Sequence, residues 1–432
     1  MSKEWLDKNS VYRYKWKDGR VLFYSPIARR YVIATDKQLE AFLADNRYAD
    51  VFGALTDYIP INQQKKVQVP ADYTLLTVLP NNVCNFSCSY CYSAAGRNGS
   101  YLKENHLKAA IKYFIETKPY GFNRPLTISY MGGGEPMLSW SLVKKGIMFA
   151  KELSSIRQIH LRHRIITNGS VLDDSSLIFM KEHDVDVSVS FEILKDVQNR
   201  QRKNYRLVEK NIRRLLDNGI NLQINVTITP TNVGRMYETL ECLLSGFSQV
   251  KNAMFEPVIG QQLFTTPQEM AVFYNHYTEQ FMKCIRHADK EGVSLTSFAF
   301  LRTIYPLERA CPGELCLTAD GQFSGCYCVS SPRDSLFEQT RYGWIDENDN
   351  VQFDNTRYYE LKTHDVYERT ECKTCKAKWN CGGGCFFQYA SYSEPYRRAV
   401  CDFTRQFVEQ AIYYKVKQRL PKKANYPILL NE

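Results

Sequence analysis

Several features that mark other classes of protein are missing from this chain of 432 residues. The stretch MSKEWLDKNS at the start has no apolar core of the kind that a signal peptide needs. No uninterrupted apolar run approaches the roughly 18 residues of a membrane-spanning helix. Internal repeats, low-complexity tracts, a long basic tail and nucleic-acid-binding motifs are also missing. These absences favour a soluble, cytoplasmic protein whose partners are neither membranes nor nucleic acids.

The composition is that of a globular protein. Hydrophobic residues make up 44% and charged residues 24%, and the length suggests two or three domains. The net charge is +10, with basic residues scattered in short clusters such as 65–66 and 415–423. A solvated basic surface explains such clusters, and attraction to an acidic partner is the functional alternative.

Cysteine is abundant, with 14 residues, and twelve of them lie within 84–91 and 311–401. Cys242 and Cys284 stand alone in helical patterns and are expected to be buried apolar residues. Because an intracellular protein needs no disulfide framework, the clustered thiols indicate metal ligands.

The middle of the chain alternates between strand and helix patterns. Six such units predict a parallel sheet with crossover helices, and six are too few for a closed eight-stranded barrel. The sequence therefore predicts an α/β fold with a partial (β/α)6 barrel. Its predicted strands are 73–79, 126–131, 159–167, 185–191, 221–229 and 252–258. Its predicted helices are 103–117, 139–153, 173–183, 205–218, 232–245 and 267–291.

The ends of the chain differ from this pattern. Residues 10–70 begin with short alternating stretches, read as two or three strands, and continue with helical ones, which predicts a small α+β module ending in the linker 63–70. After about residue 300 periodicity fades, so we expect bound metal rather than a hydrophobic core to organise this part. An amphipathic helix over 402–419 closes it. The expected domains are 1–70, 71–300 and 301–432, the last being a cysteine-rich iron–sulfur domain.

The first cysteine motif is CNFSCSYC, with Cys84, Cys88 and Cys91 on the loop after the first barrel strand. Three thiolates in one loop can hold three corners of a [4Fe–4S] cluster and leave the fourth iron free to bind a small chelating molecule. A zinc knuckle is the alternative, but it needs a fourth ligand close by. The next histidine, His106, lies in a helical pattern.

With Tyr90 before the third cysteine, this spacing resembles the signature of the radical S-adenosylmethionine (SAM) enzymes. The resemblance implies that the open iron binds the amino and carboxylate groups of SAM. Electron transfer then yields a 5′-deoxyadenosyl radical that abstracts hydrogen from a substrate. Tyr90 would lie near the adenine.

The second barrel strand ends in GGGEP, which is similar to the family's GGEP motif and would grip the methionine amino group. The third strand ends in Thr-Asn, and the fourth ends in Ser-Phe-Glu where the family often has Ser-x-Asp. The glutamate in place of aspartate leaves the role of Glu192 open, and ordinary strand-end caps are the alternative at both places. The candidate SAM-binding residues are Tyr90, Gly133, Gly134, Glu135, Pro136, Thr167, Asn168, Ser190 and Glu192.

The second cysteine region resembles the seven-cysteine SPASM extension of radical SAM enzymes, which implies two auxiliary [4Fe–4S] clusters and three clusters in all. A pair of zinc ribbons is the alternative. Ligands of the distal cluster would be Cys372, Cys375, Cys381 and Cys401. Ligands of the proximal cluster would be Cys311, Cys326 and Cys385. Its fourth ligand would be Cys316, which is better placed, or Cys328, or the site would stay open.

The resemblance implies a maturase that installs a cross-link or a related oxidative modification in a ribosomally made precursor peptide. Residues 18–43 are similar to a peptide-recognition element, which would bind an acidic leader as an added strand. A structural cap on the barrel is the alternative. An external electron donor of the flavodoxin or ferredoxin type is also implied.

Two other functions remain open. One is a sulfatase-activating maturase that oxidises Ser or Cys, but Tyr327 stands where that group carries an aspartate base. The other is a non-enzymatic iron–sulfur electron carrier or redox sensor, which would not need the GGGEP motif. No catalytic base stands out, and Tyr327 and Glu256 are candidates by position only.

Overall fold

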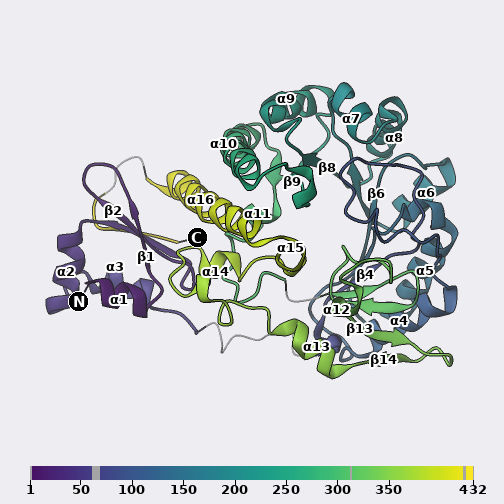
Figure 1. Cartoon of the computed structure of the whole chain (residues 1–432), viewed down its shortest axis with the longest axis horizontal. Helices are drawn as coiled ribbons and strands as arrows, with labels where there is room; N and C mark the ends of the chain where they lie inside the picture. Colours follow the sequence, from purple (N-terminus) through teal and green to yellow (C-terminus); the bar gives the residue numbers. More distant parts are fainter. Residues whose placement is uncertain (1, 61–68, 312–313, 422–424, 432) are drawn as a thin grey trace.

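The computed structural model describes residues 2–60, 69–311, 314–421 and 425–431. Figure 1 shows a small N-terminal sheet with helices, a curved layer of strands and helices, and a long helix between them. Within the described residues, no helix has both the length and the apolar character required to cross a bilayer.

The N-terminal module is an antiparallel sheet beside short helices. Its elements are β1 (Tyr12–Lys15), β2 (Val21–Ser25), β3 (Arg30–Ala34), α1 (Ser2–Lys8), α2 (Asp36–Asp45), α3 (Ala49–Phe52) and the 3₁₀ turn η1 (Gly53–Leu55). Asp18 and Gly19 both have positive φ, which is typical of the tight hairpin turn that matches strand twist. Thr35 begins α2 in a capping box with Gln38. The predicted α+β module is therefore present.

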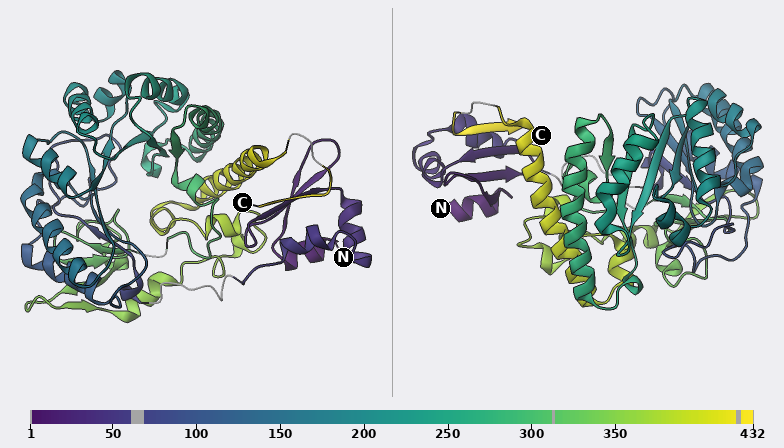
Figure 2. Two further views of the ribbon diagram at one scale, coloured as in Figure 1. Left: turned by 180° about the vertical axis from the view of Figure 1, so that it is seen from behind. Right: turned by 90° about the horizontal axis from the view of Figure 1, so that it is seen from above.

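A fourth strand in this sheet was not predicted. β15 (Ile428–Asn431) pairs antiparallel with β3, so the strand order is β1-β2-β3-β15. Residues that the sequence placed at the end of the third domain thus complete the sheet of the first (Figure 2).

The larger sheet has six parallel strands at its centre, in the predicted order. They are β4 (Leu75–Val78), β5 (Leu126–Tyr130), β6 (Leu161–Thr167), β7 (Val185–Ser190), β8 (Leu222–Ile228) and β9 (Asn252–Pro257). A short seventh parallel strand, β10 (Ser294–Thr296), forms one edge, so the described strands do not close into a full barrel. The partial barrel is confirmed.

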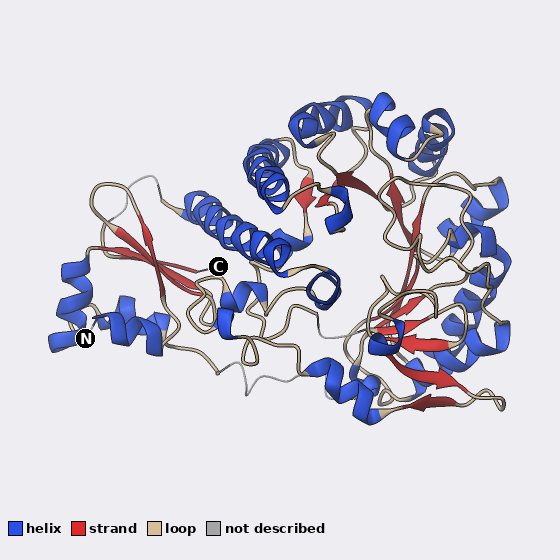
Figure 3. Cartoon of the chain, viewed as in Figure 1, coloured by secondary structure: helices blue, strands red, loops and turns tan. Residues whose placement is uncertain are grey.

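Helices cover the outer side of the curved sheet (Figure 3). They are α4 (Glu104–Glu116), α5 (Trp140–Ile156), α6 (Asp174–Glu182), α7 (Lys195–Gln201), α8 (Tyr205–Asp217), α9 (Met236–Gly246) and α10 (Pro267–Lys290). Their buried residues recur at helical spacing, as Val143, Ile147 and Ala150 do on α5. Cys284 on α10 is buried as expected, whereas Cys242 on α9 is only half-buried.

The barrel sheet continues into the cysteine-rich region. β11 (Leu315–Leu317) pairs in parallel with β4, and β12 (Gln322–Ser324), β13 (Arg341–Ile345) and β14 (Val351–Phe353) follow in antiparallel order. Leu315, Phe323 and Tyr342 are buried in the same core as the barrel strands. The expectation that this region lacks a hydrophobic core is therefore wrong for 315–361. Strands of three residues are too short to show periodicity.

The remaining elements lie around these layers. The short helices are α11 (Phe298–Leu301), α12 (Phe337–Thr340), α13 (Asn355–Lys362), α14 (Lys378–Cys381) and α15 (Phe386–Ser391). The 3₁₀ turns are η3 (Pro70–Asp72), η4 (Pro136–Ser139), η5 (Val233–Arg235), η6 (Gln261–Leu263) and η7 (Thr370–Cys372). Of the predicted linker 63–70, residues 63–68 lie outside the described part.

The last helix, α16 (Glu394–Arg419), joins the two sheets. It begins at Glu394 rather than at 402, with a proline in its first turn. Phe403 stacks on Tyr274 of α10 with ring centroids 4.2 Å apart. Further along, Val408 and Ile412 pack against the N-terminal sheet. The helix therefore lies between module and barrel, as Figure 2 shows from above.

Candidate functional site

The three cysteines of the first motif lie on the loop after β4. Cys84, Cys88 and Cys91 are half-buried, and Phe86 between them is in the barrel core. N–H groups point at two sulfurs, since Arg97 Nη2 donates to Cys91 Sγ at 3.3 Å and the Phe86 amide donates to Cys84 Sγ at 3.4 Å. Such donors stabilise thiolate charge and tune an iron–sulfur cluster. This set of thiols and N–H donors fits a cluster.

The arrangement of ligands differs from that of a single-ion site. Among the described residues, no three Cys, His, Asp or Glu side chains converge as one metal ion would require. A cubane cluster needs a wider arrangement, because each thiolate binds a different iron.

The glycine turn after β5 packs directly onto the cysteine loop. The Gly134 amide donates to the Asn81 carbonyl at 2.9 Å, and the Glu135 amide donates to the Val83 carbonyl at 2.8 Å. Gly133 has a φ of +67°, which favours glycine. A Cβ on Gly134 would lie 2.0 Å from the Val83 carbonyl oxygen. The glycines therefore allow the two loops to meet.

We expect Gly134→Ala to separate these loops, because the added methyl group would clash with the backbone of Val83. Overpacking costs about 1–3 kcal/mol, which corresponds to roughly 5- to 150-fold weaker SAM binding if the whole cost falls on the bound state. Equilibrium dialysis with labelled SAM measures the change. Gly234→Ala is the matched control, because its Cβ would meet nothing within 4 Å. Equal SAM affinity in the two variants would contradict this interpretation.

Residues at the ends of β5 and β6 meet at Glu135. Its buried carboxylate accepts hydrogen bonds from Thr167 Oγ1 at 2.5 Å, the Asn168 amide at 2.7 Å and the Met137 amide at 3.0 Å. Burial raises the pKa of Glu135, and these donors act in the opposite direction. The Asn168 side chain also donates to Asn85 on the cysteine loop at 2.9 Å. The structure brings these residues together with the first motif, and their contact with SAM stays a prediction.

A buried arginine beside Tyr90 was not predicted from the sequence. Arg202 Nη1 donates to the Tyr90 hydroxyl at 2.8 Å, and that hydroxyl donates to the Glu192 carboxylate. The Thr227 amide donates to the second oxygen of Glu192 at 3.1 Å. Burial raises the pKa of Glu192 to about 7, and Arg202 opposes this shift. Ser190 is the last residue of β7, two positions before this group.

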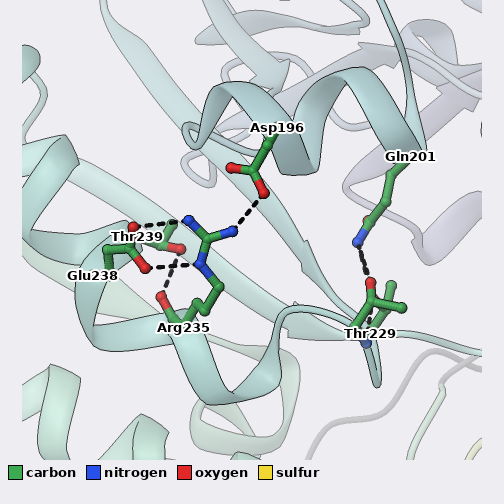
Figure 4. Close-up of polar contacts among 7 residues, drawn as sticks. Asp196, Gln201, Thr229, Arg235, Glu238 and Thr239 are labelled. Atoms are coloured by element: carbon green, nitrogen blue, oxygen red, sulfur yellow. Dashed lines mark hydrogen bonds and ion pairs between the residues drawn. The ribbon is translucent and has the colours of Figure 1, made fainter.

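The helix before this arginine is fixed at both ends (Figure 4). In its first turn, Asp196 pairs with Arg235 at 2.6 Å. At its end, Gln201 Nε2 donates to Thr229 Oγ1 at 2.9 Å. The Gln201 carbonyl also accepts from the Ser89 amide at 3.0 Å. The contacts of α7 therefore hold the cysteine loop against the β8–α9 connection.

A cavity of about 220 Å³ lies among α14, α15 and the start of α16. The cavity is lined by all four cysteines of the predicted distal set, which are Cys372, Cys375, Cys381 and Cys401. Cys385 of the predicted proximal set also lines it. Burial raises the pKa of Cys381 to about 12, so a bound metal must displace its proton. Arg405, which hydrogen-bonds Cys375, places a cation beside the thiols. The size of this cavity, the thiols that line it and the nearby Arg405 cation together fit a metal cluster.

The cysteines of the predicted proximal set lie on separate segments. The Cys326 thiol hydrogen-bonds Cys328 and raises its pKa, with burial and Cys385 acting in the same direction. Cys316 is buried in β11, with Cys326 as a neighbour. Cys311 lies beside Tyr73 and Arg309. Both extra cysteines thus adjoin Cys326, and the choice of fourth ligand stays a prediction.

The two candidate bases differ in their chemistry. Burial raises the pKa of Tyr327 well above its usual value, so this phenol stays neutral, and its ring packs edge-on against Tyr92. Burial raises the pKa of Glu256 to about 7, and its carboxylate accepts from the Phe298 amide at 2.8 Å. Glu314, which was not predicted, has its pKa raised to about 7 by burial near Tyr327. Only the carboxyl groups can exchange protons near neutral pH.

Comparison with known proteins agrees with this geometry. Residues 78–243 match the model of the Radical SAM superfamily. The serine-type anaerobic sulfatase-maturating enzyme of Klebsiella aerogenes is 20% identical over 76% of this chain and 82% of its own length. The radical SAM cyclopropyl synthase TigE of Paramaledivibacter caminithermalis is 22% identical over 29% of each chain.

Two solved structures have a similar fold. Native anSMEcpe with bound AdoMet and Kp18Cys peptide superposes with a TM-score of 0.61 at 15% identity, covering 80% of this chain and 99% of that one. Streptococcus suis SuiB bound to precursor peptide SuiA gives a TM-score of 0.54 at 13% identity, covering 75% and 74%. Residues 78–243 of this chain therefore form a radical SAM domain, within a fold similar to those of anSMEcpe and SuiB.

Proposed function

We propose that this protein is a peptide maturase that installs a cross-link or a related oxidative modification in a ribosomally made precursor peptide. The observation that carries the proposal is the second set of thiols around the 220 Å³ cavity, far along the chain from the first motif. SAM cleavage alone needs one cluster. An oxidative modification also needs an acceptor for the electron that leaves the substrate, and an auxiliary cluster is such an acceptor.

The proposed roles follow the positions of the residues. When bound, SAM and the first cluster supply the 5′-deoxyadenosyl radical that abstracts a hydrogen atom. Cys84, Cys88 and Cys91 would hold that cluster, with Arg97 and the Phe86 amide donating to two of the sulfurs. The candidate SAM-binding residues surround this loop. The two auxiliary clusters would use the distal and proximal cysteine sets, and Glu256 would be a proton acceptor.

A peptide is the substrate class that the comparisons favour. The anSMEcpe structure is described with a Kp18Cys peptide, and the SuiB structure with the precursor peptide SuiA. A net charge of +10 suits an acidic leader segment, because opposite charges attract at long range. The N-terminal sheet supplies a surface for an extended peptide. A ferredoxin- or flavodoxin-like protein would deliver the electron that starts each turnover.

Sulfatase maturation is the second candidate function, because 76% of this chain aligns with the sulfatase-maturating enzyme of Klebsiella aerogenes. The position of Tyr327 argues against it. A buried phenol with a raised pKa cannot take up a proton as a carboxylate does.

Co-expression with a short peptide encoded beside the gene tests the proposal. We expect anaerobically purified enzyme to cleave SAM, and mass spectrometry to show the loss of two hydrogen atoms from the peptide. A sulfatase-derived peptide with Ser or Cys at the target position is the parallel substrate. If the enzyme modifies the sulfatase-derived peptide and not the peptide encoded beside the gene, sulfatase maturation would be favoured. If the protein is loaded with clusters and reduced but cleaves no SAM, it is an electron carrier. That result would contradict both maturase functions.

A further inference from the structure

The N-terminal sheet could receive a peptide strand at either of its two sides, and contacts within the chain occupy both. On the side of β1, the Tyr413 hydroxyl donates to the Lys15 carbonyl at 2.7 Å. Lys376 Nζ donates to the Arg13 carbonyl at 3.4 Å. On the side of β3, the partner is β15, a segment nearly 400 residues away in sequence. The two sides therefore differ, since only the second is filled by a strand.

The pairing of β15 shows which peptide the β3 side accepts. Leu429 is opposite Val32 and packs into the cluster on the helix-covered face of the sheet. Ile428 and Leu430 face the other cluster, formed with α16. Short aliphatic side chains thus fit alternately into both faces, as the period of a strand requires. The helix α3 lies beside the same strand.

Polar contacts hold the two ends of this segment. The Tyr426 ring lies under the Arg20 guanidinium at 3.9 Å, and the Tyr426 carbonyl accepts from Gln38 Nε2 at 3.4 Å. At the other end, Arg30 Nη1 donates to the Asn431 side-chain oxygen. A carboxylate in the place of this amide would add the attraction of opposite charges and could accept a bidentate pair of hydrogen bonds from the Arg30 guanidinium.

Little of the strand is buried. Of its four residues, only Leu430 is buried, and Asn431 is exposed. Ordering an extended segment costs conformational entropy at every residue. Because little of the strand is buried, the net free energy that favours its pairing with β3 is small. A peptide with the same aliphatic pattern and an acidic residue opposite Arg30 would compete well for the position.

We propose that the β3 side of the N-terminal sheet is a peptide-binding site, and that residues 426–431 are its exchangeable internal occupant. The partner is an extended peptide with aliphatic residues at the positions of Ile428, Leu429 and Leu430 and a carboxylate at the position of Asn431. This inference rests on the proposed function, because it names where an acidic leader binds. Leader binding then requires displacement of β15.

The test uses the full-length protein and two labelled synthetic peptides, NYPILLD and NYPILLK, which copy residues 425–431 with Asp or Lys in place of Asn431. Leu430→Asp places a charge at a buried position and should release β15. We expect this variant to bind NYPILLD at least about tenfold more tightly than the wild type does. Leu207→Asp, at an exposed position on α8, is the matched control and should bind like the wild type. Equal affinity of Leu430→Asp and the wild type would overturn the proposal.

A charge reversal tests the site itself. In the Leu430→Asp background, Arg30→Glu should weaken NYPILLD at least about tenfold and favour NYPILLK. If this variant still prefers NYPILLD over NYPILLK, Arg30 is not the residue that binds the peptide carboxylate.

Hydrogen exchange on the wild type gives a measurement that needs no substitution. Amides of 428–431 should lose protection when NYPILLD is added in excess. If the amides of 428–431 stay protected while the peptide is bound, the peptide has bound at another surface. That result would overturn the proposal that it replaces β15 beside β3. These assays need neither SAM nor clusters, so their outcome is independent of whether the enzyme modifies a peptide.

Discussion

Replacing Cys84, Cys88 and Cys91 together by alanine should abolish SAM cleavage. The three thiols belong to one loop, and the auxiliary cysteine sets lie on other segments of the chain. If each of the three proposed clusters is a four-iron cube, wild type holds about 12 irons and the variant about a third fewer. Iron analysis and chromatographic detection of 5′-deoxyadenosine under dithionite measure the two effects.

The half-buried Cys242 on α9 provides the control for lost thiols. Cys242→Ala should keep all the iron and normal SAM cleavage. SAM cleavage that survives in the triple variant would mean that another part of the chain binds the SAM cluster, and the first motif would have to be reassigned.

Replacing Cys381 by alanine should stop product formation while SAM cleavage continues. Cys381 lines the cavity with three other thiols of the distal set, and losing one of four ligands should release that cluster. The substrate electron then has no acceptor. The barrel has its own core, so the first cluster should remain, and iron should fall by about a third. Mass spectrometry of the peptide and detection of 5′-deoxyadenosine separate the two activities.

The structure also limits how far this variant should unfold. Residues 315–361 pack on the barrel core, so disorder should be confined to the segments around the cavity. Limited proteolysis can locate it, and cleavage is expected between 364 and 401. A folded variant that retains full product formation would make the distal cluster a structural staple, and the electron-acceptor role would have to be abandoned.

The barrel could be predicted because its strands and helices are long. Strands such as Leu161–Thr167 and helices such as Trp140–Ile156 show their periods within one element. The short strands β10, β11 and β15, of three or four residues, gave no such signal and were not predicted. The early start of α16 had a signal, because a serine and a proline flank Glu394.

The site was predictable where chemistry follows spacing along the chain. Cysteine motifs and the glycine turn are local patterns. Arg202 is different, since it contacts Tyr90 across 112 positions of sequence and no local rule marks it. Glu314 lies close to two cysteines in sequence, but burial is what raises its pKa to about 7. Contacts and burial are produced by the fold and could not be inferred from one sequence.

The parallel pairing of β11 with β4 has a consequence for electron tunnelling. β4 leads into the first cysteine loop, and β11 contains Cys316, so the two regions proposed to hold clusters extend from adjacent strands. Neighbouring strands lie about 4.8 Å apart and are held by a ladder of hydrogen bonds. With Cys316 as a ligand of the proposed proximal cluster, the distance between the two redox centres would be set inside this sheet rather than by a linker. Tunnelling rates fall steeply with distance, so movement of the N-terminal module during peptide capture would leave the rate of electron transfer between them unchanged.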